Sequence, residues 1–405
     1  MESPSEPRAS KGRVGEVALA FLRLGCTSFG GPIAHIGYLR EAFVHRDRWL
    51  DDDEFAELVA LCQFLPGPAS SQLVFALGMR RAGLAGALAA SFCFTAPSAV
   101  AMIAFAYGVS SIATLSHAGW LHGLELAAVA VVAQAVRSMG EKLCTDRARI
   151  VLCVCAAAVL LVAPGALAQL VVLLLGALAG YVRYRNDGQP IERASAPVTL
   201  RSKRGARFAL ALFSALLLGL PALARGTGAR DALVFDAFYR AGALVFGGGH
   251  VVLPLLRAEV VPRGWVTEAT FIAGYGAAQA VPGPLFTFSA FVGASMASGH
   301  ARWLYGLFCL FALFLPAWLL IGGALPFWSL LRSKRWARAA LAGANATVVG
   351  LLLAALCRPV FSESVRSASD LVAVIVAYLA LERWKVPPWI VVVASAFAGR
   401  WLLGR

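Results

Sequence analysis

The sequence predicts an all-α polytopic membrane protein with two homologous inverted repeats, broken (Pro-Gly-Pro) helices and about 10–13 transmembrane elements. Three observations lead to this fold: the composition, a set of motifs that occurs twice, and the distribution of basic residues between loops. Hydrophobic residues make up 59% of the chain and charged residues 14%, with a mean hydropathy of +0.73. Soluble domains carry about 25% charged residues, so this composition favours a chain embedded in lipid.

The apolar residues occur in blocks. Gly83 to Gly108 contains no charged residue and is long enough to cross a hydrocarbon core of about 30 Å. The other blocks of the first half lie around Gly25, around Pro66-Gly67-Pro68, and at Trp120–Met139, Ile150–Ala163 and Gly165–Val182. The last two blocks are short, so we expect them to tilt or to pack as a helical hairpin.

A set of uncommon residues recurs in the same order. Phe21, Arg23, Gly25, Phe29, Gly30 and Gly31 return as Phe238, Arg240, Gly242, Phe246, Gly247 and Gly248. Further pairs are Arg40 and Arg257, Trp49 and Trp265, Phe55 and Phe271, Gln63-x-x-Pro66-Gly67-Pro68 and Gln279-x-x-Pro282-Gly283-Pro284, and Pro97 and Pro316. We therefore expect one repeat at 1–182, a basic linker with one extra helix at 183–230, and a second repeat at 231–405.

The basic residues predict the orientation. The net charge of +14 lies in short loops between apolar blocks, which indicates membrane orientation and no nucleic-acid partner. Six elements per half with one extra helix between them would invert the second half. The charges favour a cytoplasmic N-terminus (1–13) and linker, with the Arg40 to Glu54 loop outside, in a bacterial inner membrane.

The adjacent glycines Gly30, Gly31, Gly247 and Gly248 predict breaks in membrane helices. A break leaves backbone N–H groups unpaired, and such backbone is tolerated at membrane depth only beside protein or a water-filled cavity. The alternative is close helix packing through small residues. Recurrence of the glycines with a nearby arginine favours a functional break.

The two Pro-Gly-Pro segments should end helices, because Pro66, Pro68, Pro282 and Pro284 each remove a hydrogen-bond donor. In the first half this predicts half-helices at Asp53–Leu65 and Ala69–Arg80. The N–H groups and positive dipole at the start of the second half-helix can bind an anion. The residues concerned are Gly67, Ser70 and Ser71, and in the second half Gly283 and Thr287. A kinked hairpin without a ligand is the alternative.

Matched polar residues beside these breaks extend the predicted anion site. Arg23 and Arg240 could offer the fork of donors that suits a tetrahedral oxyanion, and Gln63 and Gln279 could add amide donors. The arginines could instead reach the lipid headgroups. Proton coupling has four candidates, namely His35, Glu57, Glu125 and His250. For Glu125 a buried carboxylate paired with His122 or an arginine is the alternative.

The sequence lacks the motifs of several enzyme classes and metal sites. The chain has no Walker A sequence, so an ATP-driven pump is not expected, and neither H-E-x-x-H nor G-x-S-x-G occurs. Eight scattered cysteines show no zinc spacing. We therefore expect no enzyme activity, no cofactor and no metal.

In combination, Phe29-Gly30-Gly31-Pro32, Gln63-x-x-Pro66-Gly67-Pro68 and their second-half counterparts resemble the chromate ion transporter family in its long, two-domain form. The resemblance covers nearly the whole chain. It implies efflux of chromate from the bacterial cytoplasm, giving resistance, with an ion gradient or potential as the driver. A proton is the expected coupling ion, and a homodimer is left open. Alternatives are a sulfate or other oxyanion carrier, and a non-transporting membrane scaffold or channel. Gly249 replaces the first half's Pro32, which suggests that the halves are not equivalent.

Overall fold

The computed structural model describes residues 12–29, 31–111, 119–163, 166–185, 203–245, 251–328 and 334–400. Within these ranges the regular structure is helical. The first half contains α1 (Val14–Thr27), α2 (Gly31–Arg40), α3 (Asp52–Phe64), α4 (Ala69–Ser111), α5 (Gly119–Leu143), α6 (Arg147–Val162) and α7 (Ala166–Tyr184). After α8 (Lys203–Thr227), the second half contains α9 (Arg230–Ala243), α10 (Val252–Val260), α11 (Glu268–Ala278), α12 (Phe288–Ser295), α13 (Ala301–Ala324), α15 (Arg335–Ala355), α17 (Ala368–Glu382) and α18 (Pro388–Ala398).

Five helices in the described residues are long and apolar enough to cross a membrane. They are found in α4, α5, α8, α13 and α15. The α4 helix is kinked at Ala82 and Gly83, where the backbone leaves helical geometry. This kink separates the predicted half-helix from the predicted Gly83–Gly108 span. The chain is thus a multi-pass membrane protein in which long spans alternate with shorter helices.

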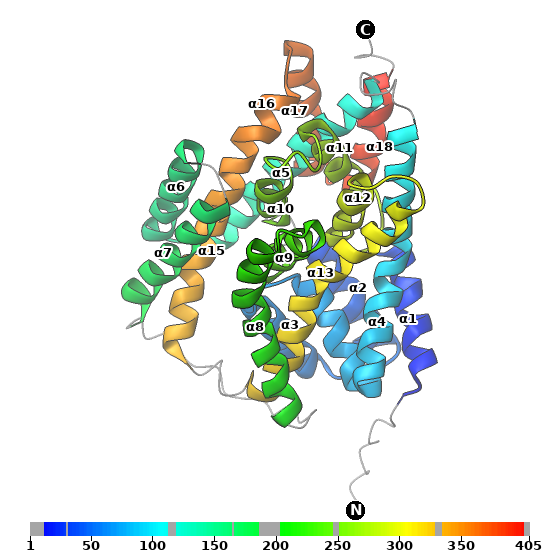
Figure 1. Ribbon diagram of the computed structural model, residues 1–405, viewed down its shortest axis with the longest axis vertical. Coiled ribbons are helices and arrows are strands. Elements are labelled where there is room, and N and C mark those ends of the chain that lie inside the picture. The colour runs from blue at the N-terminus through cyan, green and yellow to red at the C-terminus, as the bar shows by residue number, and fades with distance from the viewer. Residues whose placement is uncertain are drawn as a thin grey trace, which may run out of the picture.

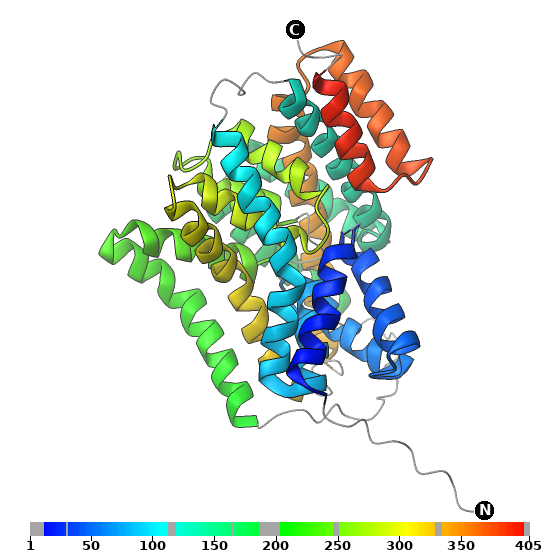
Figure 2. The ribbon, with the colours of Figure 1, turned by 90° about the vertical axis from the view of Figure 1, so that its right-hand side faces the viewer.

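The shorter helices of the first half form hairpins that enter and return at the same end. Figure 2 shows α1, α2 and α3 gathered around the lower part of α4. The amide of Gly12 donates to the carbonyl of Arg81 at 3.1 Å, and the Arg81 guanidinium pairs with Glu16 at 2.8 Å and lies over Trp49. Arg80 pairs with Glu54. The sequence-based placement of the Arg40 to Glu54 loop on the opposite side from the N-terminal segment is therefore wrong, because each broken element returns instead of crossing.

The second half meets the opposite end of α4. There the Tyr107 hydroxyl donates to the carbonyl of Gly299 at 2.8 Å, and Arg302 donates to the carbonyl of Ala106 at 3.0 Å. Arg230, the first residue of α9, donates to the carbonyl of Met296 at 3.1 Å. Helices α4 and α13, which occupy matching places in the two halves, run in opposite directions (Figure 2). The repeats are thus inverted, as the sequence predicted.

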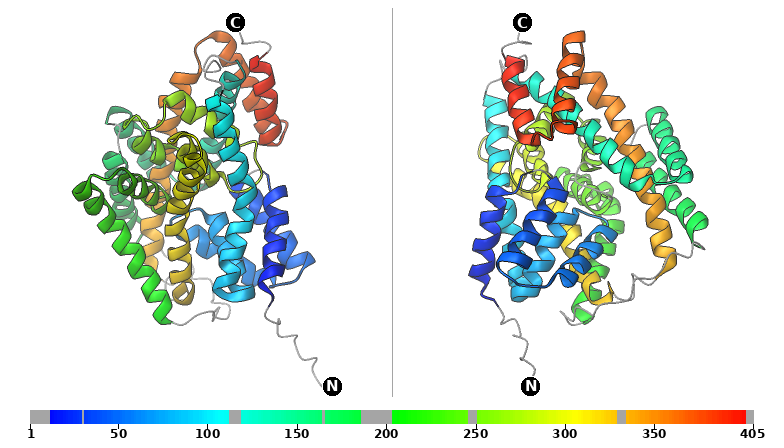
Figure 3. Two further views of the ribbon diagram at one scale, coloured as in Figure 1. Left: turned by 45° about the vertical axis from the view of Figure 1, so that its right-hand side comes forward. Right: turned by 180° about the vertical axis from the view of Figure 1, so that it is seen from behind.

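Each half lends its last hairpin to the other half. The α6/α7 hairpin packs against α15 of the second half, and the α17/α18 hairpin packs against α5 of the first half (Figures 1 and 3). We call the α6/α7 and α17/α18 hairpins the exchanged hairpins. Within the described residues, neither hairpin packs mainly on the long helix that precedes it in sequence. The exchange ties the halves together around their pseudo-twofold axis.

Small residues at matching places allow the exchanged hairpins to approach closely. A methyl group added at Gly343 of α15 would meet the backbone of Gly176 and Gly180 on α7. A methyl group added at Gly123 of α5 would meet the backbone of Ser395 on α18. In lipid the hydrophobic effect does not drive helices together, so such backbone-to-backbone packing is a main source of their attraction.

Adding a single methyl group should therefore loosen either hairpin. We expect Gly343→Ala and Gly123→Ala each to destabilise the detergent-purified protein by about 1–3 kcal/mol, the usual cost of overpacking. The measurement is the midpoint of thermal unfolding. Gly219→Ala is the matched control, because that glycine lies inside α8 with open space at its Cβ position. Equal midpoints for all three variants would contradict the close packing described here.

The inverted arrangement also predicts sidedness. In a background without native cysteines, His45→Cys and Ser298→Cys should react with a membrane-impermeant thiol reagent from opposite sides, because the loops that contain them lie at opposite ends of α4. The measurement compares whole cells with inverted vesicles. Both positions are exposed, so a failure of labelling would not come from burial. Labelling of both from one side would refute the inversion.

Candidate functional site

The Pro-Gly-Pro segments lie between helices in both halves. Helix α3 ends at Phe64 and α4 begins at Ala69, while α11 ends at Ala278 and a 3₁₀ turn begins at Leu285. The central glycines have positive φ, +119° at Gly67 and +102° at Gly283, a region in which a side chain is strained. Glycine is thus needed where the chain reverses between two prolines.

Each central glycine is held by the opposite half. The amide of Gly67 donates to the carbonyl of Val245 at 2.6 Å, and the amide of Gly283 donates to the carbonyl of Ser28 at 2.8 Å. Ser28 and Val245 occupy matching positions, each just before a Phe-Gly-Gly motif. We call this pair of bonds the crossing. It satisfies backbone groups that a broken membrane helix would otherwise leave unpaired.

The helices with matched prolines close around the crossing. A Cβ atom at Gly283 would lie 2.7 Å from the hydroxyl of Ser98, the residue after Pro97 in α4. A Cβ atom at Gly67 would lie 3.5 Å from the Cβ of Ala317, the residue after Pro316 in α13. Both proline-containing spans therefore reach the Pro-Gly-Pro segment of the other half.

Polar side chains gather on the first half's side of the crossing. Four of them are almost fully buried and have an atom without a hydrogen-bond partner: the hydroxyls of Ser28 and Ser71, Nδ1 of His35 and Oε1 of Gln72. The Nε2 atom of His35 lies 3.2 Å from the carbonyl of Ser28, and Gln72 donates to the carbonyl of Pro66 at 2.8 Å. Buried polar groups are nearly always paired, so unpaired ones at one place suggest a ligand or water.

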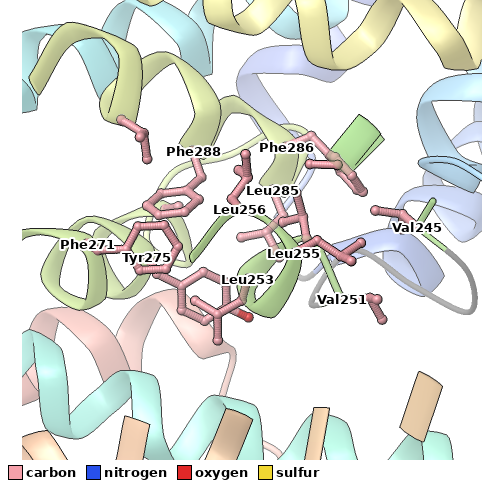
Figure 4. Packing of buried hydrophobic residues seen from close by; sticks show 14 of the residues in the cluster. Val245, Val251, Leu253, Leu255, Leu256, Phe271, Tyr275, Leu285, Phe286 and Phe288 are labelled. Atoms are coloured by element: carbon pink, nitrogen blue, oxygen red, sulfur yellow. The ribbon is translucent and has the colours of Figure 1, made fainter. Parts of the chain in front are cut away.

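The matching positions of the second half are mostly apolar. Val245, Val252, Phe288 and Ala317 occupy the places of Ser28, His35, Gln72 and Ser98. Figure 4 shows Phe288 beside Phe271 and Tyr275, with Leu285 and Phe286 near Val245. The Phe271 and Phe288 ring centroids are 4.9 Å apart. This side of the crossing is filled by packed rings instead of donors.

The two half-helix starts also differ. In the first half the α4 helix begins directly at Ala69, and the Ser71 hydroxyl is unpaired. In the second half both the amide and the hydroxyl of Thr287 donate to the carbonyl of Pro284, at 3.0 and 2.8 Å. The start of α4 therefore presents free donors and a helix dipole, whereas the second-half turn closes on itself.

The matched arginines have different surroundings. Arg23 lies on the exposed face of α1, opposite the buried Phe21 and Gly25. Arg240 is engaged by two buried carboxylates: both oxygens of Asp236 accept from it at 2.8 and 2.9 Å, and Glu259 pairs with it at 2.9 Å. Two equivalent arginine ligands therefore remain a sequence-based prediction, and Arg240 already has partners for its charge.

The remaining predicted site residues are dispersed. Gln63 is exposed, and Gln279 is half-buried with an unpaired Nε2. Glu57 accepts from the indole of Trp328 at 3.1 Å. Glu125 contacts His122 and Arg366. Gly31 begins α2, Ser70 is buried at the start of α4, and Gly30, Gly247, Gly248 and His250 lie outside the described residues.

Sequence reasoning did not name Ser28, Gln72 or Ser98. A usable signal existed for Ser98, since Pro97 and Pro316 match and the residue after each proline faces the opposite half. Ser28 and Gln72 became apparent only when their unpaired atoms were found beside the crossing.

Inverted repeats whose broken helices meet at the axis define the architecture typical of secondary membrane transporters. A family model described as "Chromate transporter" matches residues 15–181 and 232–400, so both halves are covered. The chain belongs to the chromate transporter family.

Three relatives illustrate the similarity. The "Chromate transport protein" of Pseudomonas aeruginosa is 31% identical over 95% of this chain and 91% of its own length. The protein of the same name from Cupriavidus metallidurans is 25% identical over 95% of this chain and 92% of its own length. An uncharacterised transporter of Methanocaldococcus jannaschii is 24% identical over 88% of this chain and 86% of its own length. No solved structure matches the chain.

Substitution of the crossing glycines should destabilise the fold through backbone strain and close packing together. We expect Gly283→Ala to lower the unfolding midpoint most, because its methyl group would press on the short Ser98 side chain at a cost of about 1–3 kcal/mol. Gly67→Ala should cost less, since the end of the Gln72 side chain can move. Gly264→Ala is the control, as this loop glycine has positive φ (+65°) and open space around it. An effect at Gly264 as large as that at Gly283 would contradict the packing argument.

Proposed function

We propose that this protein is a secondary transporter that exports chromate from the cytoplasm of a bacterium, giving resistance. The family assignment and the relatives named as chromate transport proteins support the substrate. The observation that carries the binding site is the group of buried, unpaired polar atoms beside the crossing, among which the hydroxyls of Ser28 and Ser71 are donors. The dianion would sit between the inverted halves, at the start of α4.

Charge supports this location. The start of α4 carries the positive end of a helix dipole, which favours anions. The buried acids described in α9 and α10, Asp236 and Glu259, are neutralised by Arg240 and Arg263, so they would repel a dianion little. Neutral hydroxyls and the backbone N–H groups at the start of α4 suit chromate because its oxygens only accept hydrogen bonds. Arg23, whose guanidinium pairs with no acid among the described residues, is proposed to donate hydrogen bonds to the anion.

For the cell we propose a bacterial inner membrane, a cytoplasmic N-terminus and a proton as coupling ion. The hairpin topology supports the orientation, because it moves Arg40, Arg46 and Arg48 to the same end as Arg80 and Arg81. Basic residues concentrate on the cytoplasmic side of membrane proteins. A homodimer stays a prediction from the sequence.

The test is flux of radiolabelled chromate into inverted vesicles, with sulfate as competitor and with the pH gradient and the potential collapsed separately. Saturable uptake that is lost with one gradient supports coupled export. Preferential transport of sulfate would replace chromate by another tetrahedral oxyanion. A rate that does not saturate would indicate a channel, and no flux at all would overturn the proposal.

The two matched arginines should respond differently to substitution. Arg23→Ala should raise the KM for chromate by about 10- to 100-fold, because a hydrogen bond to a charged group contributes about 1.5–3 kcal/mol. The KM of Arg23→Lys should lie between those of the wild type and Arg23→Ala, since lysine keeps the charge but lacks the forked donors of the guanidinium. Arg240→Ala should instead lower the amount of protein in the membrane, because it leaves the buried Asp236 without its partner and Glu259 with Arg263 alone, at about 3–5 kcal/mol.

The measurement is KM and membrane abundance for Ala and Lys variants at both positions. An unchanged KM with lower abundance for Arg23→Ala would make Arg23 structural and leave the anion site to the α4 start alone.

A further inference from the structure

A cluster of titratable side chains lies where the first half meets the exchanged hairpin of the second half. His122 and Glu125 come from α5, and Asp370 comes from the first turn of α17. The Nε2 atom of His122 lies 2.9 Å from Oδ1 of Asp370, and its Nδ1 atom lies 3.4 Å from Oε2 of Glu125. Both carboxylates are about 95% buried, with 5% and 4% of their surface exposed.

The hydrogen-bond inventory of this cluster favours an extra proton. A neutral imidazole has one N–H donor and one acceptor nitrogen, whereas an ionised carboxylate only accepts. His122 places both nitrogens against carboxylate oxygens. Both contacts can be hydrogen bonds only if the ring carries two N–H groups or one carboxyl group is protonated. In either case the site holds one proton more than neutral His122 with two ionised acids would.

The rest of the cluster fixes the charge balance. The Arg366 guanidinium lies 3.4 Å from Glu125, and the backbone amides of Arg366 and Ser367 donate to Asp370 at 2.9 and 3.0 Å. With the proton bound, the two acids are balanced by His122 and Arg366, and the net charge is zero. Without the proton the cluster is left with one uncompensated negative charge, which is costly for groups this deeply buried.

Few other titratable groups face the cluster. Among the elements packed on α5, helix α18 has none in its described residues, and α11 has Tyr275 and Glu268, of which Glu268 is paired with Arg257. The charged residues of α15, Arg335 and Arg338, lie in its first turn, away from the start of α5. In the neighbouring segment, α16 (Ser362–Ser364) has Glu363, whose carbonyl accepts from Arg366, and η6 (Leu356–Phe361) has Cys357 and Arg358.

The matching contact of the inverted repeat lacks the cluster. In the match that pairs Gly123 with Gly343, the positions of His122 and Glu125 are taken by Ala342 and Asn345. That exchanged hairpin packs closely without any ionisable group at these positions. The cluster is therefore not required by the fold, and it occurs in one of the two symmetry-related places.

We propose that His122, Glu125 and Asp370 form a binding site for a single proton, which makes the contact between α5 and α17 depend on protonation. This rests on the proposed transport function and names the place where its coupling ion would bind. The His122 side chain is 18% exposed, Arg366 is exposed, and His122 is the first residue of the apolar span of α5, so the site lies at one end of that span and at the protein surface. On release, a ring N–H bond of His122 breaks, the proton passes to water, and the ring nitrogen left behind faces a carboxylate. That repulsion weakens the α5 to α17 contact.

The first test detects the proton without transport. In the purified full-length chain labelled with ¹⁵N-histidine, His122→Gln identifies the His122 signals among the six histidines. We expect both ring nitrogens of His122 to be protonated at neutral pH and one of them to lose its proton at that pH in Glu125→Gln and Asp370→Asn. A neutral His122 ring with both carboxyl groups ionised in the wild type, or no change in either variant, would overturn the site.

The second test measures coupling in proteoliposomes with the potential clamped at zero. A gradient of one pH unit can drive about a tenfold accumulation per coupled proton, because one unit corresponds to 1.36 kcal/mol. We expect the wild type to accumulate chromate, and Glu125→Gln and Asp370→Asn to keep gradient-free chromate exchange but lose the accumulation. Gln134→Ala is the matched control, since it removes an uncharged α5 to α17 contact to the carbonyl of Leu381.

Accumulation that survives in Glu125→Gln would overturn the coupling role, and so would an equal loss in Gln134→Ala. A wild type that exchanges no chromate would count against the proposed function instead, while the histidine spectrum would still decide whether the proton site exists.

Discussion

The fold depends on the satisfaction of backbone hydrogen bonds inside a membrane. Two helices per half stop at Pro-Gly-Pro and Phe-Gly-Gly motifs, and lipid cannot pair the groups that these breaks release. The crossing supplies partners: Gly67 donates to Val245 and Gly283 donates to Ser28. Because each bond joins one half to the other, neither half can satisfy its own break. The inverted pair is thus a single folding unit at its centre.

The exchanged hairpins extend this mutual dependence to the periphery. Gly343 sits against Gly176 and Gly180, and Gly123 sits against Ser395, so the same backbone contact is made twice around the axis. Central crossing and peripheral exchange leave α4, α13 and α15 packed against elements of both halves, while α5 of the first half packs mainly against the second. A relative motion of the halves must therefore rearrange contacts at both places. This is why the proton cluster between α5 and α17 is well placed to influence the centre.

Much of this architecture could be predicted from the sequence. Repeated rare residues disclosed the two halves, and the proline and glycine chemistry located the breaks to within a few residues. The predicted side of the Arg40 to Glu54 loop was wrong, because a block of apolar residues does not reveal whether the chain crosses the membrane or returns to the same side. The three arginines in that loop argued against an outside position. They agree with the basic character of the cytoplasmic side once α1 and α2 form a hairpin. The exchange of hairpins left no trace in the order of elements.

The candidate site was harder to predict, because a comparison of the repeats selects residues that the two halves share. The polar residues of the proposed site are ones that differ between the halves. Arg23 and Arg240 match, yet among the described residues only Arg240 has acid partners, Asp236 and Glu259. A twofold-symmetric cage would place identical donors on both sides of a dianion and give two equivalent poses. The proposed site has the hydroxyls of Ser28 and Ser71 on one side, and Val245, Val252 and Phe288 on the other.

An asymmetric site of this kind gives the anion one set of donors and one apolar wall. The anion then interacts unequally with the two halves, and only such a difference in interaction lets binding shift the balance between two arrangements of them. The proton cluster is asymmetric as well, with Ala342 and Asn345 at the matching positions. The inverted repeats thus allow two arrangements of the halves that are related by symmetry. The residues that differ between the halves, at the anion site and at the proton cluster, would make the two arrangements bind the anion and the proton differently.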